Sequence, residues 1–400
     1  MADQLMDLPH TTGASFAKTC FNGFNALSGI GLLTTPYALS KSGWLSLGLL
    51  LVMAITTCYT GILLTKCLNT NRSMKTYSDV AFRAFGRKGR IFVSIFLYLE
   101  VYLVPTGLLI MEADNLVKLF PHLGVKGVNF GGLHVAGKPF FTMLVGLIIL
   151  PSMWLKDLRL LSYISLCGIL STIVIISAIV WVGIDEVGFS AAGEIFDWKG
   201  LPTALSLYAF CYGAHPVFPV LYSSMKQKNH FFKVLLITFF LCTVNYMLVA
   251  ILGYLMFGKN VQSQLTLNMS TKLGSKIVIY TSLAAPMVKY ALIISPIADA
   301  IEMNLPSKWK SKLVWILVRT LLLVSTVVVA LVFPYFESLT GLVGAILCVT
   351  ISILLPCICY LKIFSLYQKF DVEVLIVGSI MVMAVAVGVM GTYASVKTRE

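Results

Sequence analysis

Long apolar runs separated by short polar stretches occupy most of the chain. We expect eleven membrane-spanning helices, because each run approaches the roughly 20 apolar residues that a helix needs to cross a bilayer. The expected spans are 16–40, 43–67, 91–116, 139–155, 160–183, 200–223, 234–257, 276–300, 313–333, 340–361 and 373–394. A helix satisfies its own backbone hydrogen bonds within lipid. The pattern therefore predicts an all-α polytopic membrane protein.

The first apolar run is interrupted by Ser28-Gly29-Ile30-Gly31. Each glycine weakens a helix by about 1 kcal/mol relative to alanine. A break at this depth frees backbone N–H and C=O groups where lipid cannot satisfy them, which is tolerated where they line a cavity. We interpret the stretch as a substrate-binding break. The alternative is that the two glycines only allow neighbouring helices to pack closely.

The sixth run carries a second interruption, Tyr212-Gly213-Ala214-His215-Pro216. The first and sixth spans cross the membrane in opposite directions, since the sixth comes five spans after the first and each span reverses the direction. Two broken helices in this relation are typical of an inverted repeat of five plus five spans. We expect a short arm (1–15), one transporter domain (16–394) and a tail (395–400), the domain comprising repeat one (16–183), repeat two (200–361) and an eleventh helix (373–394).

Composition supports the membrane assignment. The 400 residues are 58% hydrophobic and 12% charged, with a mean hydropathy of +0.89, whereas soluble domains are about 25% charged. The net charge of +13 lies largely in short loops after the even-numbered spans, which is the positive-inside pattern rather than a nucleic-acid-binding patch. This pattern places the N-terminus in the cytosol and the C-terminus outside or in a lumen.

A broken helix presents two oppositely polarised ends. The second half of the first span begins at Gly31, and its free N–H groups suit a carboxylate, held by the backbone of Ile30, Gly31 and Leu32. Carbonyl groups near Asn25 to Ser28, and near Phe210 to Tyr212, suit an ammonium group. Together these groups match a zwitterion.

Lys289 is the most informative single residue, because it lies near the middle of the eighth span. A cation at the centre of a membrane helix costs about 2.5–3.5 kcal/mol on insertion scales, so it must face protein or water. A lysine there that can gain and lose a proton is a candidate for ion coupling. The alternative is a static ion pair.

Three further ionisable residues within spans are candidates for a role. Glu100 is about 14 Å deep at 1.5 Å per residue, and it is either the partner of Lys289 or a second proton carrier. His215 is a candidate pH switch beside the second break, or else a hydrogen-bonded structural histidine. Arg319 lies about two turns inside the ninth span, so we expect it to reach the membrane surface along its flexible side chain.

Enzyme and metal sites are not expected. The histidines at 10, 122, 134, 215 and 230 show no metal-ligand spacing, and no catalytic constellation is present. We therefore predict neither a catalytic residue nor a cofactor nor a metal. The nine cysteines fall inside or at the edge of spans, which favours buried free thiols over structural disulfides.

Seven segments resemble the plant vacuolar amino-acid transporter type of the amino acid/auxin permease family. The resemblance extends over nearly the whole chain, from Ser15 to Ile363. The segments that carry it are NGFNALSGIGLLTTPYALSKSGW (22–44), YSDVAFRAFGRKGR (77–90), LYLEVY (97–102), LRLLSYISLCGILS (158–171), GLPTALSLYAFCYGAHPVFPVLYSSMK (200–226), KYALIISPIADAIE (289–302) and FPYFESLTGLVGAILCVTISILLPCICYLKI (333–363).

The resemblance implies a leucine-transporter-type fold and secondary active transport of amino acids, usually coupled to protons. It places the substrate at Ser28 to Leu32, including Gly29, and at Phe210 to Ala214, including Gly213. Lys289 opens the family's KYAL segment. Many relatives have Ser-Gly-His at the second break, so Ala214 leaves the side-chain specificity open. The resemblance also favours the vacuolar membrane over the plasma membrane.

The partners expected are therefore an amino-acid substrate, protons and the lipid bilayer. A different function of the same fold is an amino-acid sensor, which binds the substrate and signals without net transport. A sensor is typically served by a long cytosolic tail, and the arm before Ser15 is short.

Overall fold

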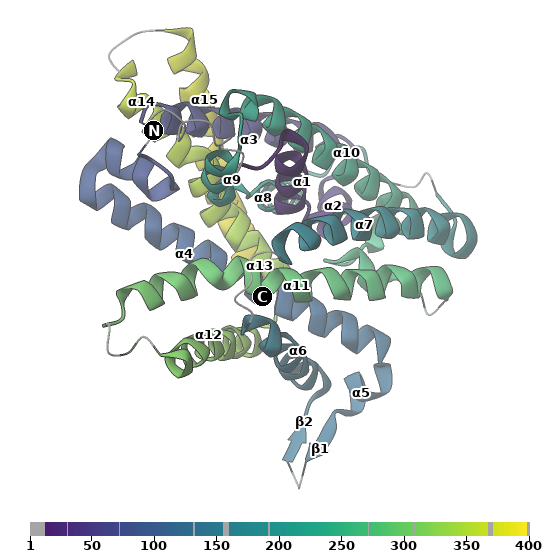
Figure 1. The fold of residues 1–400 in the computed structure, drawn as a ribbon. Helices are drawn as coiled ribbons and strands as arrows, with labels where there is room; N and C mark the ends of the chain where they lie inside the picture. Colours follow the sequence, from purple (N-terminus) through teal and green to yellow (C-terminus); the bar gives the residue numbers. More distant parts are fainter. Residues whose placement is uncertain are drawn as a thin grey trace, which may run out of the picture.

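The computed structural model describes residues 13–29, 31–71, 73–130, 133–154, 160–190, 193–270, 272–306, 309, 311–366 and 371–397. The described chain is a bundle of long helices packed alongside one another, among which α7 and α11 cross the view of Figure 1 from side to side. Apolar sequence and internally satisfied backbone groups explain this architecture. Besides helices it contains one small β-hairpin, made of β1 (Val128–Phe130) and β2 (Leu133–Val135).

The first predicted span is a broken helix. α1 (Phe16–Leu27) ends just before the Ser28-Gly29 pair, and α2 (Gly31–Ser42) begins at Gly31. Ser15 caps the start of α1 by accepting a hydrogen bond from the Lys18 N–H. Ser28 has non-helical dihedral angles (φ −71°, ψ 83°). The predicted interruption is therefore a real end of one helix and start of another.

The next part of the chain comprises α3 (Ser46–Asn69) and the long α4 (Tyr77–Leu119). Gly86 divides α4, because its φ of +67° is a conformation that L side chains rarely adopt. Thr76 and Asp79 form a capping box at the start of α4. The second part of α4, after Gly86, contains the predicted span 91–116.

Beyond α4 lie the short α5 (Pro121–Lys126), the β-hairpin, α6 (Gly137–Met153) and α7 (Leu160–Trp181). A π-helical turn, Val182–Val187, extends α7. The register of the hairpin pairs Val128 with Val135 and Phe130 with Leu133.

The sixth predicted span is the second broken helix. α8 (Leu201–Cys211) ends at the Tyr212-Gly213-Ala214 stretch, and a 3₁₀ turn (His215–Val217) leads into α9 (Phe218–Ser224). Proline at Pro216 and Pro219 suits the first turns of these short helices, because a first-turn N–H has no helical partner. Both interruptions predicted from the sequence are thus present.

The remaining helices follow the predicted spans closely. They are α10 (Phe231–Phe257), α11 (Leu273–Asn304), α12 (Lys312–Val332), α13 (Phe336–Leu342), the π-helical segment Val343–Leu354, α14 (Leu355–Ile363) and α15 (Val372–Lys397). Short 3₁₀ turns occur at Lys228–His230, Gly258–Asn260 and Leu265–Asn268.

Nine helices of the described chain are long and apolar enough to cross a membrane. The other two predicted spans correspond to α1 with α2, which are 12 residues each, and to α6, which has 17 residues. The count of eleven spans therefore stays a prediction.

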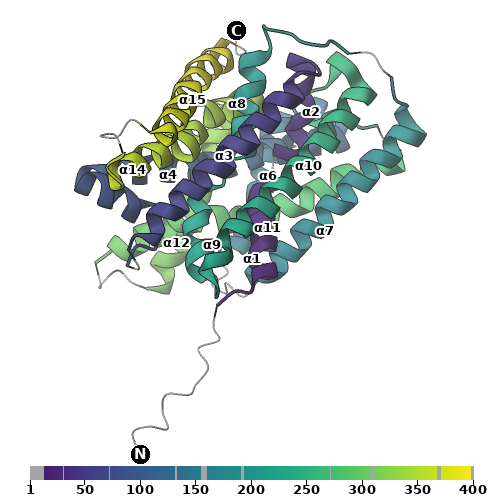
Figure 2. The ribbon, with the colours of Figure 1, turned by 90° about the horizontal axis from the view of Figure 1, so that it is seen from above.

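The broken helices lie inside the bundle. Every residue of α2 except Lys41 is buried, and α2 packs against α8 and α10, while α1 packs against α10 and α7. Seen from above, α15 and α7 lie toward opposite edges, with α8, α2 and α10 between them (Figure 2). The two breaks consequently lie among intact helices.

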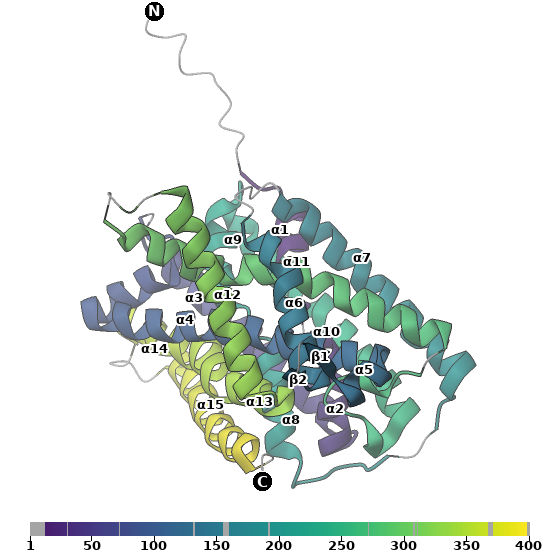
Figure 3. The same cartoon turned by 90° about the horizontal axis from the view of Figure 1, so that it is seen from below.

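The ends of the bundle agree with the expected directions of the spans. Ala14 forms backbone hydrogen bonds with Ser224 and Lys226, so the start of α1 lies beside the end of α9. The start of α1 and the end of α15 lie at opposite ends of the molecule in two views (Figures 2 and 3). The first and sixth spans thus run in opposite directions.

Arg319 differs from our expectation. The residue is 7% exposed, and its guanidinium donates to Asp299 (2.8 Å) and Glu302 (3.2 Å) on α11. It stays inside because two carboxylates at the end of the neighbouring helix pair with it, so it has no need to extend to the surface. The ion pairs join α11 to α12.

Candidate functional site

The two helix breaks lie directly against each other. A Cβ atom at Gly31 would be 2.7 Å from the Cys211 Sγ and 3.0 Å from the Cys211 Cα. The Cys211 thiol donates to the Gly31 carbonyl at 3.5 Å. Gly31 is therefore required for the close approach of α2 to the end of α8, as the packing alternative predicted for it.

Gly29 is in a different environment. It is exposed, and among the described residues other than its chain neighbours, only the Leu27 carbonyl oxygen comes within 4 Å of a Cβ placed there, at 3.9 Å. Its flanking residues Leu27 and Ser28 are buried. Packing does not explain this glycine, and the first break opens onto free space at this point.

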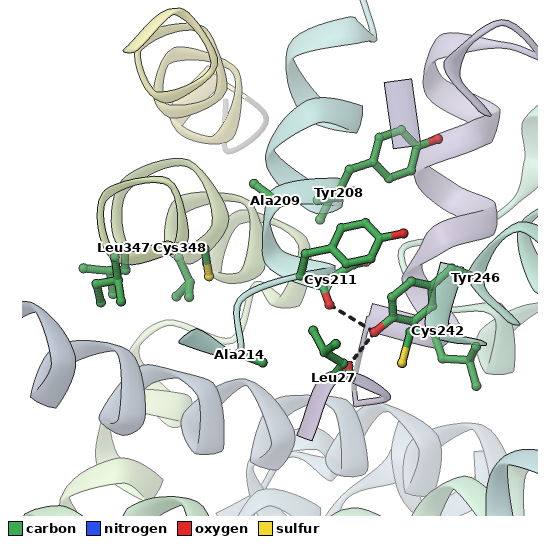
Figure 4. Packing of buried hydrophobic residues seen from close by; sticks show 14 of the residues in the cluster. Leu27, Tyr208, Ala209, Cys211, Ala214, Cys242, Tyr246, Leu347 and Cys348 are labelled. Atoms are coloured by element: carbon green, nitrogen blue, oxygen red, sulfur yellow. Dashed lines mark hydrogen bonds between the residues drawn. The ribbon is translucent and has the colours of Figure 1, made fainter. Parts of the chain in front are cut away.

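Tyr246 of α10 joins the two breaks. Its hydroxyl lies 2.5 Å from the Leu27 carbonyl oxygen at the end of α1 and 3.0 Å from the Cys211 carbonyl oxygen at the end of α8 (Figure 4). The residue is fully buried. Since the last carbonyl groups of a helix lack partners within that helix, one hydroxyl serves the ends of both broken helices.

Lys289 of α11 lies at the end of α1. Its ammonium donates to the Ser28 carbonyl at 3.0 Å and to the Asn25 carbonyl at 3.3 Å. Within the described residues, no carboxylate lies within ion-pair distance of it. The carbonyl groups that we expected to suit an ammonium therefore hold the ammonium of the protein itself. The static ion pair proposed as an alternative is not present in this part of the chain.

Side chains of α7 line the same end of α1. The Ser28 hydroxyl lies 3.4 Å from that of Thr172. Asn25 packs against Gly168, where a Cβ would overlap the Asn25 Oδ1. That oxygen is buried and has no hydrogen-bond partner among the described residues. Asn25 thus contributes an unused acceptor beside the first break.

The opposite side of the first break is the start of α2. The Leu32 N–H donates weakly to the Gly29 carbonyl, at 3.3 Å. Ile30 lies outside the described residues. A helix that begins at Gly31 presents the positive end of its dipole here.

The residues of the second break pack against α10 and form hydrogen bonds with one another. Tyr212 is fully buried, bonds to Thr243 (2.9 Å) and stacks on Phe239, both of α10. The Phe210 carbonyl accepts the Gly213 N–H at 3.2 Å, and the Tyr212 carbonyl accepts the Ala214 N–H at 3.0 Å. The carbonyl groups at the end of α8 are thus turned back into the chain.

Glu100 lies at the second break rather than beside Lys289. A Cβ at Gly213 would be 3.3 Å from the Glu100 Oε1 and 2.5 Å from the Cys348 Sγ. The Cys348 thiol donates to the Glu100 Oε1 at 3.6 Å, whereas its Oε2 has no partner among the described residues. The structure shows no ion pair between Glu100 and Lys289, so the partnership that we considered for them is absent.

His215 is fully buried below the second break. Its Nε2 lies 3.1 Å from the Thr60 hydroxyl of α3, which also donates to the Ser352 carbonyl at 2.6 Å. The ring packs on Phe218. This arrangement fits the structural alternative for His215, because it joins three elements, although the Nδ1 is without a partner among the described residues.

Sequence reasoning missed Tyr246, Thr172 and Cys348. Each is a single small or amphipathic residue within an apolar run, and such residues are common in membrane helices without any role. Only the packing of α10, α7 and the π-helical segment around the breaks distinguishes them. Within the described chain, no cluster of three or more His, Cys, Asp or Glu side chains could hold a metal ion.

Chemically, the arrangement can hold a zwitterion. One helix start offers N–H groups, and the break between α1 and α2 is open at Gly29. The carbonyl groups at the end of α8 already accept bonds from the chain, but a carbonyl oxygen has a second lone pair for an ammonium. A partly buried lysine lies on the carbonyl groups of α1, and a buried acid adjoins the other break.

Comparison with known proteins gives consistent results. Residues 12–397 match the family model described as "Transmembrane amino acid transporter protein". The chain is 51% identical to the amino acid transporter AVT1I of Arabidopsis thaliana, covering 96% of this chain and 95% of that protein. It is 49% identical to the amino acid transporter AVT1J of the same plant, covering 96% and 91% of the two chains.

Among solved structures, the crystal structure of MhsT in complex with L-phenylalanine matches with a TM-score of 0.63. The match covers 96% of this chain and 99% of MhsT, at 13% sequence identity. It confirms the leucine-transporter-type fold. From the family match, which covers nearly the whole chain, and the two plant relatives, this chain belongs to the transmembrane amino acid transporter family.

Proposed function

We propose that the protein carries amino acids across a membrane by alternating access, coupled to a proton gradient. Family membership and the names of the plant relatives support amino-acid transport. The observation that carries the mechanism is the Lys289 ammonium bonded to the Ser28 and Asn25 carbonyl groups at the first break. The family is one of transport proteins rather than enzymes.

The substrate carboxylate binds at the start of α2, against the backbone of Ile30, Gly31 and Leu32. Asn25, Ser28 and Gly29 form the rest of this side. Since Lys289 occupies the α1 carbonyl groups, the substrate ammonium is directed to the second break, at Phe210, Tyr212, Gly213 and Ala214. The open space at Gly29 supports this placement.

The proposed proton coupling depends on the hydrogen bonds from Lys289 to the Ser28 and Asn25 carbonyl groups. While it is protonated, its ammonium ties the end of α1 to α11. Loss of the proton removes a charge-assisted hydrogen bond, which is worth more than a neutral one, and frees α1 to move. Glu100 at the second break is the other candidate proton carrier, and His215 is a third, in contact with α3.

The membrane is proposed to be that of the vacuole, with the N-terminus in the cytosol. The likeness to the plant vacuolar transporters and the basic loops after the even-numbered spans support these two points. The partners are then the amino acid, protons and the surrounding lipid.

Proteoliposomes test the proposal. Purified protein is reconstituted, a pH gradient of either polarity is imposed, and uptake of a panel of radiolabelled amino acids is measured. We expect at least one amino acid to accumulate above equilibrium with one polarity, and to stop doing so when a protonophore is added. Absence of accumulation with both polarities would refute the transport function, and binding without flux would favour a sensor.

A further inference from the structure

α4 carries a second buried acid, which neither the fold nor the proposed site accounts for. Glu112 is 1% exposed, and neither of its carboxylate oxygens has a hydrogen-bond partner among the described residues. It lies twelve residues after Glu100, close to the other end of the predicted span 91–116. An isolated buried carboxylate costs several kcal/mol or more, because it loses its hydration without any compensation.

Basic groups on the elements that pack against α4 are either exposed, as Lys276 of α11 and Lys312 of α12 are, or already in use. Lys138 of α6 pairs with Asp114 and donates to the Pro334 carbonyl, and Lys289 of α11 bonds to the α1 carbonyl groups. Arg319 of α12 pairs with Asp299 and Glu302, and Lys66 of α3 pairs with Glu373.

The other titratable groups along α4 do not neutralise Glu112 either. Those of α13 and the π-helical segment are the acid Glu337 and the thiol of Cys348, which contacts Glu100. His122 and Lys126 of α5 are exposed, and Lys362 of α14 has another partner. Hence no cation of the described chain forms an ion pair with Glu112.

The outer part of α4 and the loop that packs against α4 contain further polar groups without partners among the described residues. Asn115, one turn along the same helix, is fully buried and uses neither of its side-chain polar atoms. The turn Leu265–Asn268 packs against α4 and α2, and Gln264 at its start donates to Asp114 at 3.4 Å. In this loop the buried Gln264 Oε1 and Thr266 Oγ1 also lack partners among the described residues.

We propose that Glu112 is a proton-binding site of the transport cycle, closed off in this conformation by the loop at Leu265–Asn268. The carboxyl group holds its proton while the loop is packed on α4, since the neutral acid costs far less to bury than the carboxylate. When the loop lifts, water reaches Glu112, and the proton passes to water and leaves a hydrated carboxylate. The reverse step binds a proton and permits closure.

This inference rests on the proposed proton-coupled transport and adds a residue to it. The proton site at Glu112 lies on α4 beside the outer loop, whereas Lys289 acts at the first break. The two sites therefore act in separate steps. Glu112 acts in the opening at one end of the molecule, and Lys289 acts in the release of α1 in its interior.

The test compares Glu112→Gln with a control, Asp185→Asn. The control removes an exposed acid on the same predicted side of the membrane. Gln copies the protonated form in shape and charge. We expect Glu112→Gln to retain amino-acid exchange in counterflow within about twofold of wild type, and to lose accumulation driven by the pH gradient. Asp185→Asn should keep both activities, and Glu112→Asp, which restores a titratable group, should recover pH-driven accumulation.

Infrared difference spectra between high and low pH give a readout that does not depend on transport. Wild type should show a carboxylic acid C=O band that Glu112→Gln lacks. The proposal is overturned if the variant accumulates substrate as wild type does, if the band persists in it, or if Glu112→Asp rescues nothing. Accumulation by wild type that follows a sodium gradient at fixed pH would also overturn it. If wild type transports no amino acid while the band is lost in the variant, the transport function fails and the proton site stands.

Discussion

At the scale of single residues, two side chains hold the broken helices in place. The Tyr246 hydroxyl serves the ends of α1 and α8, and the Lys289 ammonium binds the last carbonyl groups of α1. The difference between them is charge. A hydroxyl maintains its bonds at any physiological pH, whereas an ammonium can lose its proton, so only Lys289 can make the geometry of the break depend on pH.

Lys289→Ala should abolish the pH dependence of transport while amino-acid binding is retained. The substitution removes the hydrogen bonds to the Asn25 and Ser28 carbonyl groups but leaves the helix starts and ends that face the substrate. Uptake across a series of pH values, with binding measured separately on purified protein, checks this. Lys276→Ala, which removes an exposed lysine of the same helix, is the control and should behave as wild type. A pH profile that is unchanged in Lys289→Ala would remove this residue from the mechanism.

At the scale of elements, the two glycines of the first break have different roles. Gly31 lets α2 approach α8 at Cys211, whereas Gly29 faces open space. The two parts of α4 also differ in their surroundings. Its inner part contributes Glu100 to the second break, and its outer part holds Glu112, which has no hydrogen-bond partner among the described residues. One helix thus contacts both the centre of the molecule and its outer end.

Gly31→Ala should destabilise the protein, since the new methyl group overlaps Cys211. Overpacking costs about 1–3 kcal/mol, against about 1 kcal/mol gained from helix propensity. Gly29→Ala should leave stability unchanged and weaken substrate binding, because the methyl group enters the free space of the break. Thermal unfolding in detergent and binding measurements separate the two effects. Gly48→Ala on α3, where a Cβ meets nothing within 4 Å, is the control for propensity; equal effects at positions 29 and 31 would contradict the distinction.

At the scale of the whole molecule, the direction in which the later helices cross the membrane depends on whether the short α6 crosses it. With 17 residues, it spans about 26 Å at 1.5 Å per residue, slightly less than a hydrocarbon core of about 30 Å. Three predicted crossings, α6, α7 and α8 with α9, separate the exposed Lys126 from the exposed Lys228. If α6 does not cross, these two residues lie on the same side.

Cysteine labelling decides the point. In sealed vesicles of one orientation, we expect a membrane-impermeant maleimide to label only one of the two variants Lys126→Cys and Lys228→Cys. Permeabilised vesicles, in which both should react, provide the control. The buried native cysteines described in the structure should add little background, and an unsubstituted sample measures it. Labelling of both variants from the same side would show that the number of crossings between them is even.

Much of the fold follows from the sequence, for a simple physical reason. In lipid, backbone groups must be satisfied locally, so apolar runs become helices whatever their neighbours are. The helix positions and both interruptions could therefore be predicted before any packing was known. Arg319 shows the limit of this reasoning, because its burial depends on Asp299 and Glu302 of another helix.

The sequence by itself determined that Ser28-Gly29 and Tyr212-Gly213 break their helices, and that Lys289 lies deep in a span. Tertiary structure alone decided which groups meet there. It placed Lys289 on the α1 carbonyl groups, brought Glu100 to the second break, and gave Glu112 no partner among the described residues. Helix formation depends on residues that are neighbours along the chain, so the hydropathy pattern predicts it. The contacts of a side chain depend on how helices distant in sequence pack, which the hydropathy pattern does not predict.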